Sequence, residues 1–297
     1  MMKAGQVMTI PVSPQPGTGV YRGPGEVGKL GAFGSWLGRE VQATDYLDPS
    51  WNGDWNPVAL ARWGAWKKTQ PGRKVVLGIH MVPKQGGSLS AGQRGAYDAQ
   101  YRELTRMLVK HGLGDSVIRL GYEPNNPSIG PWQGTSNPEG FKAMYHRAHG
   151  IMKSIAPNLR FDFNLAVGTS GRVTSWWTLY PGSAYVDIVG LNVYDVWWQR
   201  YSATPQQRWK HTLTTTIGVA DHRAFAAAVG KPISYPEWGL YKRGDSYAGG
   251  GDNPYFVDRM AELTRHARYN AYFDLDWGGG VLDNFPNGRA HYKELYR

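Results

Sequence analysis

Short apolar segments that favour β-structure recur along this 297-residue chain and alternate with longer segments of helical periodicity. Several of the short segments are apolar on both faces, which is typical of parallel strands that are buried on both sides. The expected strands are Gly31–Leu37, Val41–Tyr46, Lys74–Val82, Ser116–Tyr122, Arg160–Val167, Val186–Val193, Pro232–Pro236 and Ala271–Trp277. Strands that alternate with helices in this way predict a single α/β domain, a (β/α)8 barrel.

The segments between the expected strands place apolar residues three and four positions apart, as an amphipathic helix does. The clearest cases are Tyr101-Leu104-Leu108, Phe141-Met144-Ala148-Ile151-Ile155 and Phe256-Met260-Leu263-Ala267. Asn137-Pro138 and Asn253-Pro254 each join an N-cap residue to a first-turn proline, so they predict helix starts. Gly112 and Gly230 stand where helices are expected to end.

The N-terminal segment is rich in proline and glycine, and no linker follows it. We therefore expect residues 1–26 to form an extended arm and residues 27–297 to form the barrel. Gly23-Pro24-Gly25-Glu26-Val27-Gly28 matches the GxGxxG pattern of dinucleotide-binding turns. It precedes the first expected strand and no helical pattern follows it, so we interpret it as part of the arm. An open, doubly wound sheet is the competing architecture.

Composition excludes several classes of function. The chain has no cysteine, which excludes disulfides, Cys-ligated zinc, iron–sulfur clusters and thiol nucleophiles, and no run of about 18 apolar residues that would span a membrane. The net charge of +10 suits an anionic polymer, but the Lys and Arg residues are scattered, which favours a solvated basic surface over nucleic-acid binding. Aromatic residues make up 13% of the chain. They indicate a large core or a cleft for a flat, partly apolar ligand such as a sugar.

The ends of the expected strands carry the candidate chemistry, because the loops that follow barrel strands form the active face. The fourth strand runs into Glu123 and the seventh into Glu237, so the two carboxyl groups are expected to face each other across the barrel mouth. Retaining glycoside hydrolysis needs one protonated and one ionised carboxyl group about 5–5.5 Å apart. Tyr194, at the end of the sixth strand, is expected to donate its hydroxyl to the nucleophile.

These motifs resemble those of glycoside hydrolase family 26, within the clan of barrel glycosidases whose catalytic glutamates lie on strands four and seven. The resemblance is carried by Gly31-Ala32-Phe33-Gly34, Arg119-x-x-x-Glu123-x-Asn125, the segment from Tyr180-Pro181-Gly182 to Tyr194, and Lys231-Pro232 to Glu237-x-Gly239. It implies a retaining, endo-acting hydrolase without cofactor or metal, in which Glu123 is the acid/base and Glu237 the nucleophile. β-Mannan is the default substrate of the family.

Two positions depart from the family pattern. Tyr122 stands where the family has a histidine, and the tryptophan that normally follows the motif is displaced, with Trp132 the nearest candidate. These positions shape the subsite around the reacting sugar. The mechanism therefore carries over more directly than mannan as the substrate.

Further candidates for substrate binding lie near the same strand ends. Trp277 is the expected stacking platform, and the other candidates are His80, Arg119, Tyr122, Asn125, Trp132, Tyr194, Trp197, Trp238 and Asp276. Several have purely structural interpretations beside the functional one. Glu123 could pair with Arg119, Asn125 could cap a turn, and His80 could be a core imidazole. Asp274 and Asp276 could bind sugar hydroxyls or pair with arginines.

The expected partner is a polysaccharide or oligosaccharide, with no nucleic acid, no membrane span and a monomeric chain. β-Mannan, β-glucan, xylan and an anionic or cell-envelope glycan such as an arabinan all remain open. A non-catalytic carbohydrate-binding protein on a decayed glycosidase barrel is the alternative, and Tyr122 is the feature that keeps it open. Residues 1–25 show no apolar stretch of a secretory signal, and the lack of cysteine suits either compartment. We expect a secreted or extracellular protein.

Overall fold

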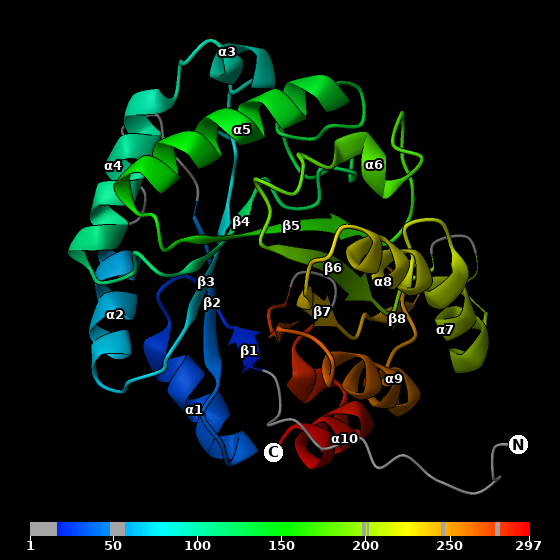
Figure 1. Ribbon diagram of the computed structural model, residues 1–297. Helices are drawn as coiled ribbons and strands as arrows, with labels where there is room; N and C mark the ends of the chain where they lie inside the picture. Colours follow the sequence, from blue (N-terminus) through cyan, green and yellow to red (C-terminus); the bar gives the residue numbers. More distant parts are fainter. Residues whose placement is uncertain (1–16, 48–56, 198–199, 201, 245–246, 277–279) are drawn as a thin grey trace, which may run out of the picture.

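The computed structural model describes residues 17–47, 57–197, 200, 202–244, 247–276 and 280–297 (Figure 1). Its centre is a closed barrel of parallel strands in the spatial order β1-β10-β7-β6-β5-β4-β3-β2, with helices around the outside (Figure 1). The predicted (β/α)8 barrel is confirmed. The doubly wound open sheet is excluded, because the first and last barrel strands pair with each other.

The elements follow one another as strand and helix along most of the chain. The barrel strands are β1 (Gly17–Tyr21), β2 (Gln42–Leu47), β3 (Val75–Ile79), β4 (Val117–Leu120), β5 (Arg160–Ala166), β6 (Ile188–Tyr194), β7 (Ile233–Gly239) and β10 (Tyr269–Phe273). The helices are α1 (Val27–Leu37), α2 (Pro57–Lys68), α3 (Leu89–Gln93), α4 (Asp98–Lys110), α5 (Pro138–Ile155), α6 (Trp176–Leu179), α7 (Pro205–Thr214), α8 (Val219–Ala228), α9 (Pro254–Thr264), η1 (Leu282–Asn284) and α10 (Pro286–Tyr296). A small hairpin, β8 (Arg243–Gly244) and β9 (Tyr247–Ala248), follows β7.

The first barrel strand lies earlier than the sequence indicates. β1 falls inside the segment that was expected to be an arm, and it closes the barrel between β10 and β2. Its sequence GTGVY has no apolar run, so it does not look like a buried strand. The glycines are needed for close packing, since a Cβ at Gly19 would lie 3.1 Å from the Asn270 carbonyl oxygen and 3.3 Å from the Ala271 Cβ.

The segment Gly31–Leu37, expected as the first strand, belongs instead to helix α1. Its apolar residues Leu30, Phe33 and Leu37 are the buried ones, at spacings of three and four, and the positions between them face solvent or are partly buried. One apolar face with helical period is the pattern of an amphipathic helix. The small residues between the apolar ones had concealed this period.

The GxGxxG segment connects β1 to α1, so it lies between a strand and a helix, contrary to the interpretation from sequence. However, its backbone binds a carboxyl group of the protein itself. The backbone N–H of Gly25 donates to Asp45 Oδ2 at 2.9 Å, and the Trp63 indole N–H donates to the same oxygen at 2.6 Å. Asp45 is fully buried on β2. The loop thus fastens α1 and α2 to the barrel.

The predicted helix boundaries hold. Asn137 accepts from the Gly140 N–H and Asn253 from the Phe256 N–H, so both cap the helices that their Asn-Pro pairs indicated. Gly112 and Gly230 follow the ends of α4 and α8 with φ of 73° and 65°, a backbone conformation that favours glycine. Among the described residues, no helix combines the length and the apolarity that crossing a bilayer requires.

Candidate active site

A cleft of about 870 Å³ opens at the carboxyl ends of the barrel strands. Both candidate glutamates, Glu123 and Glu237, line it, as do phenol rings at or near the ends of β1, β2, β4 and β6. This is the end of the barrel where the loops after the strands meet. The structure therefore brings the two predicted carboxyl groups into one cavity.

Glu123 lies three residues after the end of β4, in a turn with unusual backbone geometry. Its φ is +51°, which costs a residue with a side chain about 1 kcal/mol or more and is common at functional sites. The Glu123 N–H donates to the Asn164 carbonyl at 3.0 Å. Its carboxyl oxygens accept from Asn192 Nδ2 at 2.7 Å and from Asn126 Nδ2 at 2.9 Å. Neutral amide groups therefore hold this carboxyl group.

Glu237 lies within β7 and has a different set of partners. Oε2 accepts from Arg119 Nη2 at 3.1 Å and from the Tyr46 hydroxyl, and Oε1 accepts from the Tyr194 hydroxyl at 2.7 Å. The hydrogen bond from Tyr194 to the expected nucleophile is therefore present. One guanidinium and two phenols therefore donate to this carboxyl group.

Arg119, on β4, is fully buried below the two glutamates. Its ion pair is with Glu237 and not with Glu123, which removes the simplest structural interpretation of Glu123. The guanidinium also donates to Asn164 Oδ1 and Asn192 Oδ1, both at 3.2 Å, and to the Tyr46 hydroxyl at 2.7 Å. The hydrogen bonds of Arg119 thus go to other residues of the protein. Its guanidinium places a fixed positive charge beside the carboxyl groups.

The two carboxyl groups differ in their electrostatic surroundings. Burial raises the pKa of Glu123 to about 7, and the negative charge of Glu237 contributes to the same shift. The amide donors Asn126 and Asn192 act in the opposite direction without cancelling it. Glu123 therefore keeps its proton to a higher pH than an ordinary glutamate does, beside a Glu237 that is ion-paired with Arg119.

His80, Tyr122 and Trp132 form one cluster beside the cleft. The Tyr122 hydroxyl lies 2.8 Å from His80 Nε2, and the His80 ring stacks on Trp132 with the centroids 4.4 Å apart. Trp132 is buried and donates its indole N–H to the Tyr122 carbonyl at 2.9 Å. Tyr122 lines the cleft, whereas Trp132 supports it from behind, so the expectation that Trp132 contacts substrate is not met by its position.

Asn125 and Trp197 lie at the cleft wall. Asn125 uses its side-chain amide to hold the end of β5, donating to the carbonyls of Ala166 and Gly168 and accepting from the Ala166 N–H. The Trp197 ring stacks on His211 with a centroid distance of 4.2 Å and an interplanar angle of 4°. One face of Trp197 is therefore covered within the protein.

The structure does not bring Trp238 and Asp276 to the carboxyl groups. Trp238 directly follows Glu237 in β7, so its side chain points to the opposite face of the strand. It is fully buried against Tyr272 and Tyr292 between barrel and helices, and the expectation that it binds sugar is wrong. Asp276 is exposed and pairs with Lys242. Asp274 pairs with Arg22 at 2.8 Å, and Trp277 lies outside the described residues.

Four residues that contact the carboxyl groups or Arg119 were absent from the predicted site: Tyr46, Asn126, Asn164 and Asn192. Tyr46 lies near the end of β2 and Asn192 two residues before Tyr194 on β6. The rule that function gathers at the carboxyl ends of barrel strands would have selected both. Asn164 lies inside β5 and carries no comparable signal.

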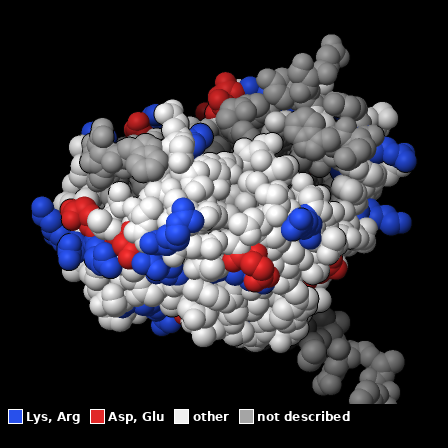
Figure 2. All heavy atoms as spheres, turned by 90° about the horizontal axis from the view of Figure 1, so that it is seen from above, with Lys and Arg blue, Asp and Glu red and all other residues white. Residues whose placement is uncertain are grey.

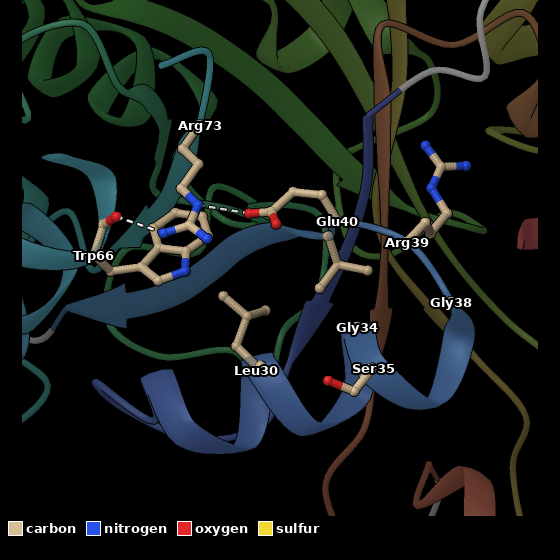
Figure 3. Close-up of a pocket in the computed structure, with 10 residues that line it drawn as sticks. Leu30, Gly34, Ser35, Gly38, Arg39, Glu40, Trp66 and Arg73 are labelled. Atoms are coloured by element: carbon tan, nitrogen blue, oxygen red, sulfur yellow. Dashed lines mark hydrogen bonds and ion pairs between the residues drawn. The ribbon is translucent and has the colours of Figure 1, made fainter. Parts of the chain in front are cut away.

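A second cavity, of about 410 Å³, lies at the other end of the barrel, beside α1 and before β2 and β3 (Figure 3). Two of its charged groups pair with each other: Arg73 Nε lies 2.6 Å from Glu40 Oε1, and the Arg73 guanidinium lies over the Trp66 ring (Figure 3). Arg39 points away from this pair and donates to the Tyr296 carbonyl. This cavity has no carboxyl pair of the kind found in the cleft. Among the described residues, no group of three His, Asp or Glu side chains is placed to hold a metal ion.

Comparison with known proteins finds the same fold in solved structures of barrel glycosidases. No family model matches the sequence, and no curated protein matches it. Solved structures do match. A chain from the structures of two fungal β-1,4-galactanases shares 15% identity with a TM-score of 0.58, over 89% of this chain and 90% of its own.

The resemblance extends to glycoside hydrolase family 26. GH26A from a Muricauda species shares 16% identity with a TM-score of 0.57, over 86% of this chain and 83% of its own. An endo-β-1,4-mannanase from Cellulomonas fimi shares 18% identity with a TM-score of 0.59, over 84% of this chain and 63% of its own. The chain thus has the fold of these glycoside hydrolases, which confirms, at the level of the fold, the resemblance that the sequence motifs indicated.

Proposed function

We propose that this protein is a retaining, endo-acting glycoside hydrolase that cleaves a polysaccharide by double displacement. Glu237 is the nucleophile and Glu123 the acid/base. The observation that carries the proposal is the pair of buried carboxyl groups in one cleft with opposite surroundings. Glu237 is ion-paired with Arg119, while burial and the charge of Glu237 raise the pKa of Glu123 to about 7.

In the first step, the Glu237 carboxylate attacks the anomeric carbon while Glu123 gives its proton to the leaving oxygen. The glycosidic bond breaks, and its electron pair remains on the leaving oxygen. Once Glu237 is bonded to the sugar its negative charge is gone, which removes the repulsion that helped to raise the pKa of Glu123. Glu123 is then ready to act as a base.

In the second step, Glu123 takes a proton from water and the resulting oxygen nucleophile attacks the anomeric carbon. The bond to Glu237 breaks, and its electron pair returns to the carboxylate. Arg119 and the phenols of Tyr46 and Tyr194 stabilise that returning charge. Two inversions at the same carbon give net retention.

The lining of the cleft favours an uncharged sugar at the cleavage point. Among the described residues, its charged lining groups are the two glutamates, and burial lowers the pKa of His211 on the wall, which favours the neutral imidazole. Arg119 is fully committed to protein partners. We therefore place a neutral β-linked polysaccharide, such as a mannan, ahead of an anionic envelope glycan. Since such polymers do not cross membranes, the enzyme is proposed to act outside the cell.

A binding protein on a decayed barrel is the second candidate, because Tyr122 replaces the family histidine. The contacts of Tyr122 weaken this alternative. Its hydroxyl is hydrogen-bonded to His80. The guanidinium carbon of Arg119 lies 5.3 Å from the centroid of its ring. Tyr122 therefore takes part in the hydrogen-bond network of the site, and both carboxyl groups keep their donors.

The first prediction concerns Glu237. Glu237→Gln removes the nucleophile, so turnover should fall by a factor on the order of 10³ or more. The measurement is release of new reducing ends from a panel of neutral and anionic polysaccharides, with the products identified by mass spectrometry. Circular dichroism checks that the variant keeps its fold.

Glu139→Gln is the matched control, because Glu139 is exposed at the start of α5, pairs with Lys142 and is not one of the residues that line the cleft. It should leave turnover unchanged. Near-native activity of Glu237→Gln would refute the proposed function. Saturable binding of a polysaccharide without new reducing ends in the unmodified protein would favour the decayed barrel.

A further inference from the structure

The two oxygens of the Glu237 carboxylate are bound unequally. Oε2 accepts from Arg119 Nη2 at 3.1 Å and from the Tyr46 hydroxyl. Within the described residues, Oε1 accepts from the Tyr194 hydroxyl alone, at 2.7 Å. A carboxylate oxygen offers about two lone-pair sites for hydrogen bonds. Both sites of Oε2 are therefore used, whereas Oε1 keeps one free.

The direction of the hydrogen bonds at Tyr46 follows from chemistry. Arg119 Nη1 lies 2.7 Å from the Tyr46 oxygen, and a guanidinium can only donate. The hydroxyl thus accepts from Arg119 and gives its own proton to Glu237 Oε2. Burial raises the pKa of Tyr46 well above its ordinary value, although the charge of Arg119 acts against this shift. The phenol therefore keeps the proton that it donates.

The Tyr46 ring is held in place by other aromatic rings. Its centroid lies 4.7 Å from that of Tyr21 and 5.1 Å from that of Tyr122, both in edge-on arrangements. The Arg119 guanidinium carbon lies 5.2 Å from the ring centroid of Tyr46. These contacts come from β1 and β4, on both sides of β2 in the barrel. Tyr46 is therefore a fixed donor and not a mobile side chain at the surface.

We infer that Tyr46 is a positioning residue that holds Oε2 of Glu237 and so makes Oε1 the oxygen that bonds to the anomeric carbon. The inference rests on the proposed function. In the first step, the free lone pair of Oε1 forms the new bond, the glycosidic bond breaks, and the leaving oxygen takes the proton of Glu123. In the second step, the bond to Oε1 breaks, its electron pair returns to Glu237, and Glu123 takes the proton of water.

Tyr46→Phe tests this role, since it removes the hydroxyl and keeps the ring. A hydrogen bond to a charged group is lost, so kcat should fall about 10- to 100-fold while KM changes less than about twofold. A merely structural role of Tyr46 would instead lower the yield of folded protein or raise KM together with the loss of kcat. The split between kcat and KM therefore distinguishes a positioning residue from a structural one.

Tyr145→Phe is the control, because Tyr145 is a fully buried phenol between α5 and β5, outside the cleft. It should leave kcat and KM unchanged. A Tyr46→Phe variant that folds and has the native kcat would overturn the inference. That result would leave the role of Glu237 untouched, because Glu237→Gln tests it separately.

A second measurement needs no variant. The unmodified protein is treated with 2,4-dinitrophenyl 2-deoxy-2-fluoro-β-glycosides of mannobiose and cellobiose, which trap glycosyl-enzymes, and the crystal structure of the adduct is determined. The glycosyl bond is expected on Oε1, with Tyr46 and Arg119 still on Oε2. A bond on Oε2 would refute the inference while supporting the proposed function. If neither reagent labels the protein and no polysaccharide of the panel is cleaved, the proposed function fails and the inference fails with it.

Discussion

Glu123 and Glu237 are the same residue type in one cleft, and their neighbours give them different chemistry. Glu237 contacts a guanidinium and two phenols, whereas Glu123 contacts two carboxamides. The charge of Glu237 then raises the pKa of Glu123 further. A pair of carboxyl groups whose surroundings push their proton affinities apart is what an acid and a nucleophile need.

The pH dependence of activity should reflect Glu123. It acts as an acid only while protonated, so kcat/KM on a polysaccharide should fall as the pH rises through about 7. A 2,4-dinitrophenyl glycoside has a leaving group that needs no proton. Its kcat/KM should therefore keep its value across this range, and a polysaccharide profile that stays flat to pH 9 would contradict the assignment of Glu123.

At the scale of elements, the β1–α1 loop links the first strand and helices of the barrel to one another. Asp45 on β2 accepts from the Gly25 N–H, the Tyr46 N–H and the Trp63 indole, and so it joins the loop and α2 to the strand that bears Tyr46. A buried carboxylate is tolerated there because several donors satisfy it. The glycine-rich pattern that resembles a nucleotide-binding turn therefore binds the Asp45 carboxyl group of the protein itself.

Trp63→Phe tests this arrangement. It removes one donor from a buried carboxylate and leaves a smaller ring in the core, so the free energy of unfolding should fall by about 2–4 kcal/mol. Denaturant unfolding followed by circular dichroism measures the change. Trp177→Phe is the control, because that indole is 60% exposed and its replacement should have little effect. Equal stabilities of the two variants would show that the Asp45 link is unimportant.

At the scale of the whole molecule, the positive charge is spread over the surface. In the view of Figure 2, from the side that carries α3 and α5, Lys and Arg side chains are interspersed with Asp and Glu. Several bases are paired, as Lys67 and Lys74 are with Asp115 and Arg147 is with Asp98. Among the described residues, the charged groups that line the cleft are acidic, so the described Lys and Arg residues lie outside its lining.

Salt should therefore have little effect on substrate binding. For a neutral polysaccharide, KM is expected to change less than about twofold between 20 and 300 mM NaCl, because no charge pair forms on binding. Initial rates at several salt concentrations measure this. A KM that rises steeply with salt, together with cleavage of an anionic glycan and not of a neutral one, would assign the basic surface a role in substrate capture.

The sequence by itself determined the barrel class, most strand and helix positions, the Asn-Pro helix starts and the location of Glu123, Glu237 and Tyr194 at strand ends. These features follow from local periodicity and capping, which neighbouring residues encode. The sequence did not predict β1, because two glycines interrupt the apolar pattern of this buried strand. The prediction for Trp238 was wrong because adjacent residues of a strand face opposite sides, and Glu237 takes the side of the cleft.

Only the tertiary structure decided the partners of each carboxyl group. Tyr46 and Glu237 are 191 residues apart, Arg119 and Glu237 are 118 apart, and Asn192 and Glu123 are 69 apart. No local pattern specifies such pairs, because they exist only after β1 pairs with β10 and closes the ring. Closure sets which side chains point inward at the same height, and this arrangement places Arg119 beside one glutamate and carboxamides beside the other.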